Sequence, residues 1–112
     1  MASLIETVGK NVALDAIGTA YGYMALFSDA GITEVTGGSY VRQAITWGAA
    51  AAGAKNISAN CVFAGMPTST VTHVGIYTAL TAGTRGALDD VISRTLVAGD
   101  TFTVTGFTIT LP

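Results

Sequence analysis

T-V-T-H-V-G-I-Y-T, residues 70–78, is the clearest strand in this chain of 112 residues. The stretch is rich in the β-branched side chains that are enriched in strands, namely Val71, Thr72, Val74 and Ile76. Pro67 precedes it and Gly83 follows it, and both residue types interrupt regular structure. A well-bounded strand of this kind predicts a mainly β fold.

Four further stretches have strand character, and all of them are short: 21–27, 40–47, 60–64 and 92–97. The second of these follows Gly37-Gly38 and alternates regularly, with one face made of Val41, Gln43, Ile45 and Trp47. Several short strands separated by glycine-containing turns predict a small antiparallel β-sandwich or a barrel-like domain. We expect its core to include Trp47, Val74, Ile76 and Phe107.

The end of the chain changes its pattern at residues 105–106. Apolar side chains occupy even positions at Phe102 and Val104, but odd positions from Phe107 to Leu111. Because a shift of one residue moves every side chain to the other face of a strand, the register must change here. We expect either a β-bulge or a crossing between sheets, and the glycine at position 106 tolerates both.

The N-terminus predicts a short helix over residues 3–17. Its apolar residues recur at helical spacing: Leu4, Ile5, Val8, Val12 and Ala16. Ser3 and Glu6 have the spacing of a capping box, and Gly18 is a natural stop. Gly9 costs about 1 kcal/mol relative to alanine, so the helix needs a surface to dock on. The chain therefore divides into an N-terminal helical segment, 1–18, and a single β-sandwich domain, 19–112.

Composition limits the classes of partner. Half of the residues are hydrophobic, which excludes a disordered chain. Five basic residues are scattered against seven acidic ones, so we expect no nucleic acid partner. No run of about 20 apolar residues is present, so we expect no membrane partner. Only 11% of residues are charged, and such a surface suits contact with other subunits in a homo-oligomer. A monomer solubilised by its hydroxyl side chains is the alternative.

The sequence contains no recognisable set of catalytic or metal-binding residues. His73 has no carboxylate beside it to orient a general base, and Cys61 has no neighbour that would stabilise a thiolate. One His and one Cys fall short of the four ligands of a zinc site. Asp89-Asp90 lack the alternating oxygen donors of a calcium loop. We therefore expect no enzymatic activity, no cofactor and no metal.

Three segments carry a resemblance to a known family. E-V-T-G-G-S-Y-V-R-Q-A-I-T-W at 34–47 resembles a motif of small structural proteins of tailed bacteriophages, especially those of actinobacterial hosts. P-T-S-T-V-T-H-V-G-I-Y at 67–77 and A-G-D-T-F at 98–102 resemble two further segments of that family. Region 84–94 departs from it, because the chain has Arg85 and Asp89-Asp90 in place of an aromatic-rich hairpin.

The resemblance implies a non-enzymatic, mostly β component of a virion, assembled in the host bacterium. Such proteins are described as head-decoration, minor tail or tail-fibre proteins. We favour a capsid decoration protein that binds the major capsid protein or other virion proteins and stabilises the head lattice. A minor tail or tail-fibre subunit is the first alternative. A module that binds a host glycan through exposed Tyr40 or Trp47 is the second.

Four residues are candidates for contact with those partners. Leu4 and Val8 belong to the N-terminal helix, whereas Tyr40 and Arg42 belong to the first family motif. Arg42 lies on the same strand face as Tyr40, where it could stack on the ring or pair with a carboxylate. The motif also has a purely structural interpretation, because Gly37-Gly38 permits a tight turn.

Overall fold

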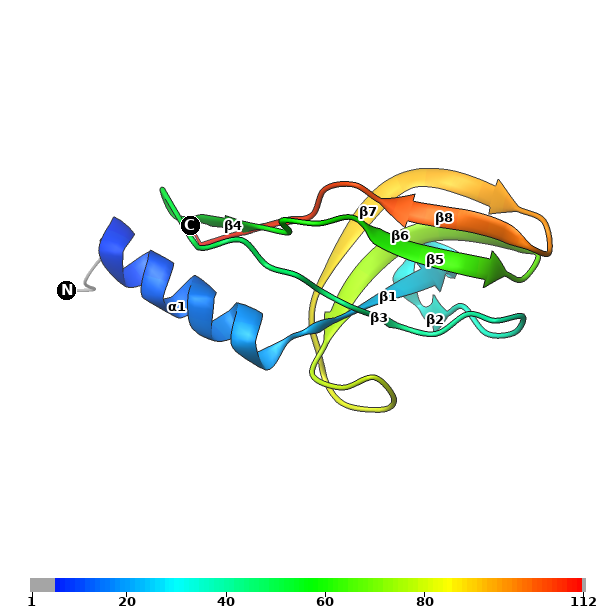
Figure 1. Cartoon of the computed structure of the whole chain (residues 1–112), viewed down its shortest axis with the longest axis horizontal. Helices are drawn as coiled ribbons and strands as arrows, with labels where there is room; N and C mark the ends of the chain where they lie inside the picture. The colour runs from blue at the N-terminus through cyan, green and yellow to red at the C-terminus, as the bar shows by residue number, and fades with distance from the viewer. Residues whose placement is uncertain (1–5, 112) are drawn as a thin grey trace.

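An antiparallel sheet of five strands is the base of the molecule (Figure 1). The computed structural model describes residues 6–111, and the backbone alone for Ile92. The strand order is β2–β1–β6–β7, and β3 pairs with β1 on the same edge as β2. These strands are β1 (Tyr23–Ser28), β2 (Thr33–Glu34), β3 (Gln43–Ala44), β6 (Ser69–Tyr77) and β7 (Arg85–Leu96). A 3₁₀ turn, η1 (Asp29–Gly31), joins β1 to β2.

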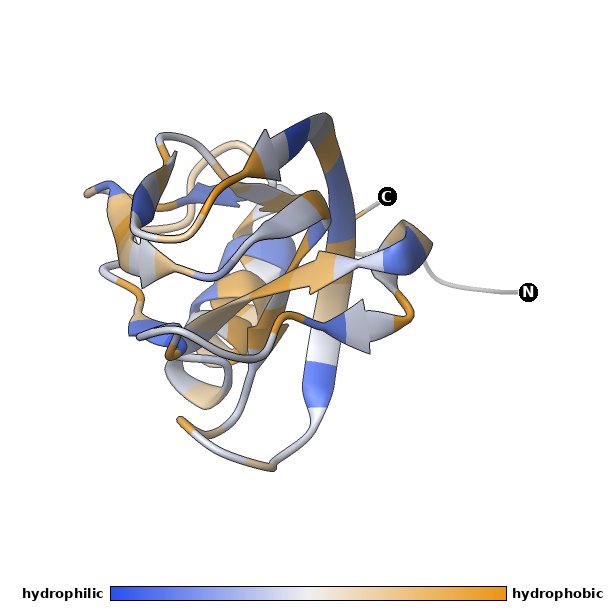
Figure 2. Cartoon of the chain, turned by 90° about the vertical axis from the view of Figure 1, so that its right-hand side faces the viewer, coloured by the Kyte–Doolittle hydropathy of each residue, from blue (hydrophilic) through white to orange (hydrophobic). Residues whose placement is uncertain are grey.

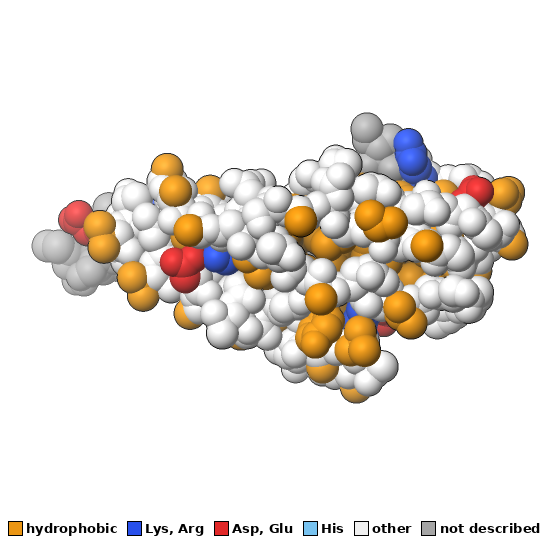
Figure 3. All heavy atoms as spheres, in the orientation of Figure 1, with side chains coloured by type: hydrophobic (Ala, Val, Ile, Leu, Met, Phe, Trp, Pro, Cys, Tyr) orange, Lys and Arg blue, Asp and Glu red, His pale blue; other side chains and the backbone are white. Residues whose placement is uncertain are grey.

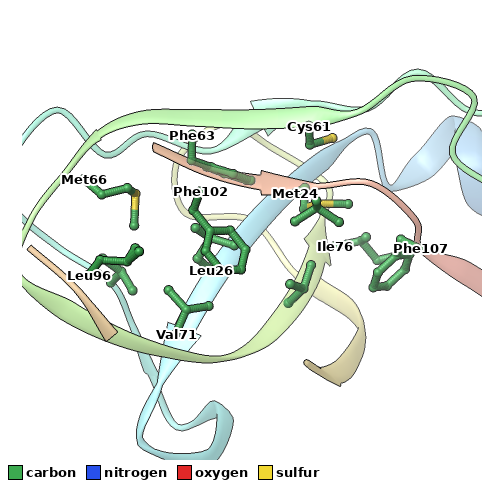
Figure 4. Packing of buried hydrophobic residues seen from close by; sticks show 13 residues of the cluster. Met24, Leu26, Cys61, Phe63, Met66, Val71, Ile76, Leu96, Phe102 and Phe107 are labelled. Carbon is green, nitrogen blue, oxygen red and sulfur yellow. The ribbon is translucent and has the colours of Figure 1, made fainter. Parts of the chain in front are cut away.

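A second, two-stranded layer covers one face of this sheet. It consists of β5 (Cys61–Met66) and β8 (Asp100–Val104), which pair antiparallel. The core lies between the layers, as Figure 4 shows, and is formed by Met24, Leu26, Val71, Val74, Ile76, Phe63, Met66, Leu96, Phe102 and Val104. The segments that enclose it carry much of the hydrophobic colour in Figure 2. This arrangement confirms the small mainly β, sandwich-like fold predicted from the sequence.

We call the five-stranded sheet and the β5–β8 layer together the β body. An arm extends from one end of it (Figure 1), so that the molecule measures 51 × 26 × 25 Å. The arm consists of the helix α1 (Thr7–Ala20) and of two paired strands, β4 (Ala54–Asn56) and β9 (Thr108–Thr110). A tight turn precedes β4, with Ala52 and Gly53 both at positive φ. Two successive residues of this kind are typical of hairpin turns.

The predicted break at residues 105–106 is confirmed, and it is a crossing between sheets. β8 pairs with β5 in the body, whereas β9 pairs with β4 in the arm. Phe102 and Val104 are buried before the crossing, and Phe107 is buried after it, although its position has the opposite parity. The change of face in the sequence therefore marks the point where the chain leaves the body.

Two predicted elements have other bounds in the structure. The strand expected at 40–47 is reduced to the two residues of β3 and an isolated bridge at Trp47. The strand expected at 92–97 is the end of β7, which spans twelve residues because it follows β6 along its length. Pairing with β6 thus overrides the weak strand preference of the polar residues at 85–91.

The helix also differs from its prediction. α1 begins at Thr7 and continues past Gly18 to Ala20, and within the described residues no side chain caps its start. Gly18 does not stop the helix but packs against β4, where a Cβ would overlap the Cε of Lys55. The expected capping residue Ser3 lies outside the described residues.

Trp47 occupies the junction between body and arm. Its indole N–H donates to the carbonyl oxygen of Tyr21 at 3.1 Å, and its ring meets the edge of Phe107 at 6.2 Å between centroids. The side chain is half-buried rather than largely buried as expected. Val74, Ile76 and Phe107 are buried as predicted.

Candidate interaction surfaces

The first family motif folds back on itself around a partly buried ion pair. Arg42 holds Glu34 with two parallel hydrogen bonds, Nε to Oε2 at 2.9 Å and Nη2 to Oε1 at 2.8 Å. This fork geometry is the strongest form of an arginine–carboxylate contact. Burial alone would raise the pKa of Glu34, but the hydrogen bonds from Arg42 and Tyr40 outweigh it and hold that pKa below its usual value. Glu34 is therefore ionised near neutral pH.

Tyr40 connects this ion pair to the main sheet. Its hydroxyl donates to Glu34 Oε2 at 2.7 Å and accepts the backbone N–H of Leu26 in β1 at 3.0 Å. Its ring stacks on Phe63 of the second layer, with 6.0 Å between centroids. Burial and the neighbouring carboxylate raise the pKa of the Tyr40 phenol far above its usual value. Tyr40 thus belongs to the framework of the β body.

The remaining donors of Arg42 organise the loop between β6 and β7. Nη1 donates to the carbonyl oxygens of Ala79 at 3.0 Å and of Ala82 at 2.6 Å. The guanidinium also lies over the ring of Tyr77, 3.7 Å from its centroid. The sequence allowed stacking on Tyr40 or pairing with a carboxylate, and the structure shows pairing with Glu34 and stacking on Tyr77. Contacts 37 and 40 residues away could not be found from local spacing.

A hollow of about 360 Å³ opens beside this network. Exposed Val41 and Leu80 form its apolar walls, and Thr36, Glu34 and Arg42 also line it. Figure 3 shows hydrophobic side chains gathered on this side of the β body. Because four hydrogen bonds already occupy Arg42, the chemistry available to a partner here is mainly apolar.

Segments 34–47, 67–77 and 98–102 approach one another at their turns. Gly38 has a positive φ of 55°, and a Cβ there would come within 2.7 Å of the Gly65 carbonyl oxygen. Glycine is therefore required where the first motif crosses the approach to the second. In the third segment, Gly99 donates its N–H to the carbonyl oxygen of Met66, and Asp100 accepts the N–H of Val97. These segments hold the end of the β body together.

In the arm, α1 docks on β4 through polar contacts. The ammonium of Lys55 is almost fully buried and donates to Asp15 Oδ1 and to the Gly48 carbonyl, both at 2.7 Å. Asp15 also accepts the N–H of Ala50, and Asn11 accepts that of Gly53. The hydrogen bond from Lys55 and that from the Ala50 backbone lower the pKa of Asp15. Sequence spacing gave no signal for this pair, in which Lys55 is buried and Asp15 is half exposed.

The opposite side of α1 faces outward and is apolar. Val8 is 75% exposed and Val12 is 67% exposed, whereas Leu14 and Gly18 of the same helix are buried. The spacing of apolar residues predicted an apolar helix face, and the structure turns that face away from its own domain. The candidate Val8 lies on this face, and the candidate Leu4 lies outside the described residues.

Of the other residues considered for chemistry, His73 on β6 and Asp90 on β7 are opposite each other in the sheet, whereas Cys61 lies on β5. His73 is half-buried, and its Nδ1 lies 3.1 Å from the hydroxyl of Thr72. Cys61 is buried in the core, and burial raises the pKa of its thiol. Across residues 6–111, no cluster of three or more His, Cys, Asp or Glu could hold a metal ion. No described helix has the length and apolar character needed to cross a membrane.

A family model described as podophage GP4 fiber I protein gp80 matches residues 5–112. The chain belongs to this family. The match covers both the β body and the arm. No curated protein matches the chain.

Membership of the gp80 fibre family identifies the chain as a component of a phage virion that is assembled in the host cell. It confirms the expectation of a phage structural protein that interacts with other virion proteins. The more specific expectation, that the chain is related to structural proteins of actinobacterial phages, stays a prediction.

Proposed function

We propose that this chain is a non-enzymatic subunit of a fibre on a tailed-phage virion. The match of the fibre family over residues 5–112 carries this proposal. Decoration of the head through the major capsid protein, which the sequence favoured, has no comparable support. The glycan-binding alternative is also weaker, because Tyr40 and Trp47 both use their polar atoms and part of their rings inside the chain.

The arm is the proposed attachment end of the subunit. It is narrow, it lies at one end of an elongated molecule (Figure 1), and it presents an apolar helix face. The proposed units are a tether at 1–18 and a β unit at 19–112, because all strands within residues 6–111 lie in the second range, although α1 itself continues to Ala20. Leu4 and Val8 are the proposed contact residues of the tether.

Tyr40 and Arg42 have a different proposed role. Their polar atoms are satisfied within the chain, so they position the loop at 79–82 beside the hollow. Val41 and Leu80 would then make the contact with a neighbouring virion protein. This second surface lies on the β body and is independent of the arm.

Immunogold electron microscopy of purified virions tests the location of the subunit. Antibody against the recombinant chain should label fibres and leave intact heads unlabelled. Virions of a related phage without this chain provide the control for specificity. Labelling over the head surface would overturn the fibre proposal and favour decoration.

A truncated chain tests the attachment end. Virions produced with a chain that lacks residues 2–17 should contain little of it. A Val97→Ser variant with an intact arm should still be incorporated, because Val97 is exposed in the turn between β7 and β8, outside both proposed surfaces. Circular dichroism of the purified truncated chain checks that the strands have formed. Normal incorporation of a folded truncated chain would show that the arm is not the attachment end.

A further inference from the structure

We propose that the outward face of α1 binds the same face of α1 in neighbouring copies of this chain, so that the arms of several subunits form one helical bundle. This inference rests on the proposed fibre function, because it names the partner of the attachment end. The face is defined by Val8, Val12, Ala16 and Thr19, and we call it the helix stripe.

The helix stripe is continuous and apolar. Its residues follow one another at intervals of four, four and three, which places them on one side of a helix. All four are exposed in the isolated subunit, Val8 and Val12 strongly so. The hydroxyl of Thr19 donates to the carbonyl oxygen of Asp15 at 3.1 Å, so the stripe has no unsatisfied side-chain donor. Water is therefore a poor environment for this face.

The two charged side chains of α1 lie against β4 or the turn before it, although that of Asp15 is still 53% exposed. Between Thr7 and Ala20 the helix has two charged residues, Lys10 and Asp15. Lys10 is half-buried, and a Cβ on Gly53 would lie 3.6 Å from its Cδ, which places it on the side that faces the arm. Asp15 is bound to Lys55. A charged partner would thus find no complementary group, whereas a second stripe of the same kind matches in polarity and carries no like-charge repulsion.

Contacts between α1 and residues 53–55 fix the orientation of the stripe. Lys55 passes beneath Gly18 and binds Asp15, and Asn11 binds the turn at Gly53. Contacts at three points along the helix prevent it from turning its apolar side inward. The stripe therefore faces outward in every copy before assembly, which lowers the ordering cost of association.

The size of the stripe indicates that more than two copies meet. Fourteen helical residues span about 21 Å, and a strip about 10 Å wide then buries on the order of 200 Å² per contact. A stable pair of proteins buries about 800 Å² per partner, so one helix pair is too small. In a closed ring each helix touches two neighbours along the two edges of the stripe, which raises the buried area per copy. We expect association that is weak in solution and strengthened where the fibre holds the copies together.

Cysteine cross-linking detects weak association of this kind. Val12→Cys in a Cys61→Ala chain should form a disulfide-linked dimer under mild oxidation. Val97→Cys in the same background is the matched control, because Val97 is 62% exposed but lies in the turn between β7 and β8. The control should cross-link at least about tenfold more slowly. Equal rates at the two positions would refute the proposal.

Sedimentation equilibrium provides the second measurement. The average mass of the wild-type chain should rise above 11.3 kDa as its concentration increases towards about 1 mM. Val12→Asp should weaken self-association at least about tenfold, because a carboxylate would be buried in an apolar contact. Val97→Asp should associate like wild type, and circular dichroism should be the same for all three. A wild-type chain that stays monomeric throughout this range refutes the proposal.

Incorporation into virions separates this inference from the fibre proposal. If Val12→Asp associates like wild type while immunogold labels fibres, the bundle is wrong and the fibre assignment stands. If the wild-type chain stays monomeric but Val12→Asp is excluded from virions, the stripe binds a different virion protein, which also refutes the bundle. If heads are labelled and the stripe cross-links, the fibre assignment is wrong and the contact between copies stands.

Discussion

Arg42→Met should destabilise the β body without changing its core. The substitution keeps a long apolar stem but removes all four hydrogen bonds of the guanidinium. It leaves the Glu34 carboxylate, whose side chain is only 26% exposed, without its ionic partner. Removing one member of a buried ion pair costs about 3–5 kcal/mol of stability. Because Glu34 is partly exposed, we expect the free energy of unfolding to fall by about 3 kcal/mol. For a chain of this size that lowers Tm by roughly 10–15 °C.

Urea unfolding followed by the fluorescence of Trp47 measures this loss. The double variant Glu34→Gln and Arg42→Met is the matched control, because it removes both charges and should recover about half of the loss. The midpoint of unfolding should fall while the slope with urea stays constant. If Arg42→Met lies within about 1 kcal/mol of wild type, the ion pair does not anchor the motif.

The same pair predicts a pH dependence with a definite sign. The pKa of Glu34 is lowered in the folded chain, so its stabilising effect is complete above its unfolded value of about 4.3. The effect is lost as the pH falls through the lower, folded pKa. Acidification from pH 6 towards pH 3 should therefore destabilise wild type more steeply than Arg42→Met. Parallel pH profiles for the two proteins would contradict the assigned role of Glu34.

Three further predictions concern packing. Trp47→Ala should lower the free energy of unfolding by about 3 kcal/mol, which calorimetry measures. This value is the lower end of the range for removing a large aromatic side chain, because Trp47 is half-buried. Gly18→Ala should destabilise the chain because its Cβ meets Lys55, whereas Gly9→Ala in the exposed part of α1 should stabilise it by about 0.5–1 kcal/mol; equal effects would exclude the close approach. Cys61 should react with a thiol reagent only after unfolding, because it is buried and its thiol pKa is raised; rapid reaction of the native chain would contradict the placement of β5.

Segment 34–47 illustrates why a candidate site was harder to predict than the fold. Its spacing identified Tyr40 and Arg42 as unusual residues, and both are important in the structure. Their partners, however, are Glu34, the loop carbonyls and the ring of Tyr77, and several of these are distant in the sequence. A sequence pattern shows that an arginine is present but not which carbonyls its donors will reach.

The sequence by itself determined the mainly β fold, the N-terminal helix and the change of face at residues 105–106, whereas the strand pairing in the structure decided that this change is a crossing between sheets. These follow from periodicity, which is a local property: the parity of apolar residues between Phe102 and Leu111 changes whatever the rest of the chain does. Tertiary structure alone decided that the 40–47 segment bends around Arg42, that α1 continues through Gly18, and that its apolar stripe faces outward. Each depends on a contact between residues far apart in the chain, Arg42 with Ala79 or Lys55 with Asp15, and the free energy of such contacts exceeds local preference.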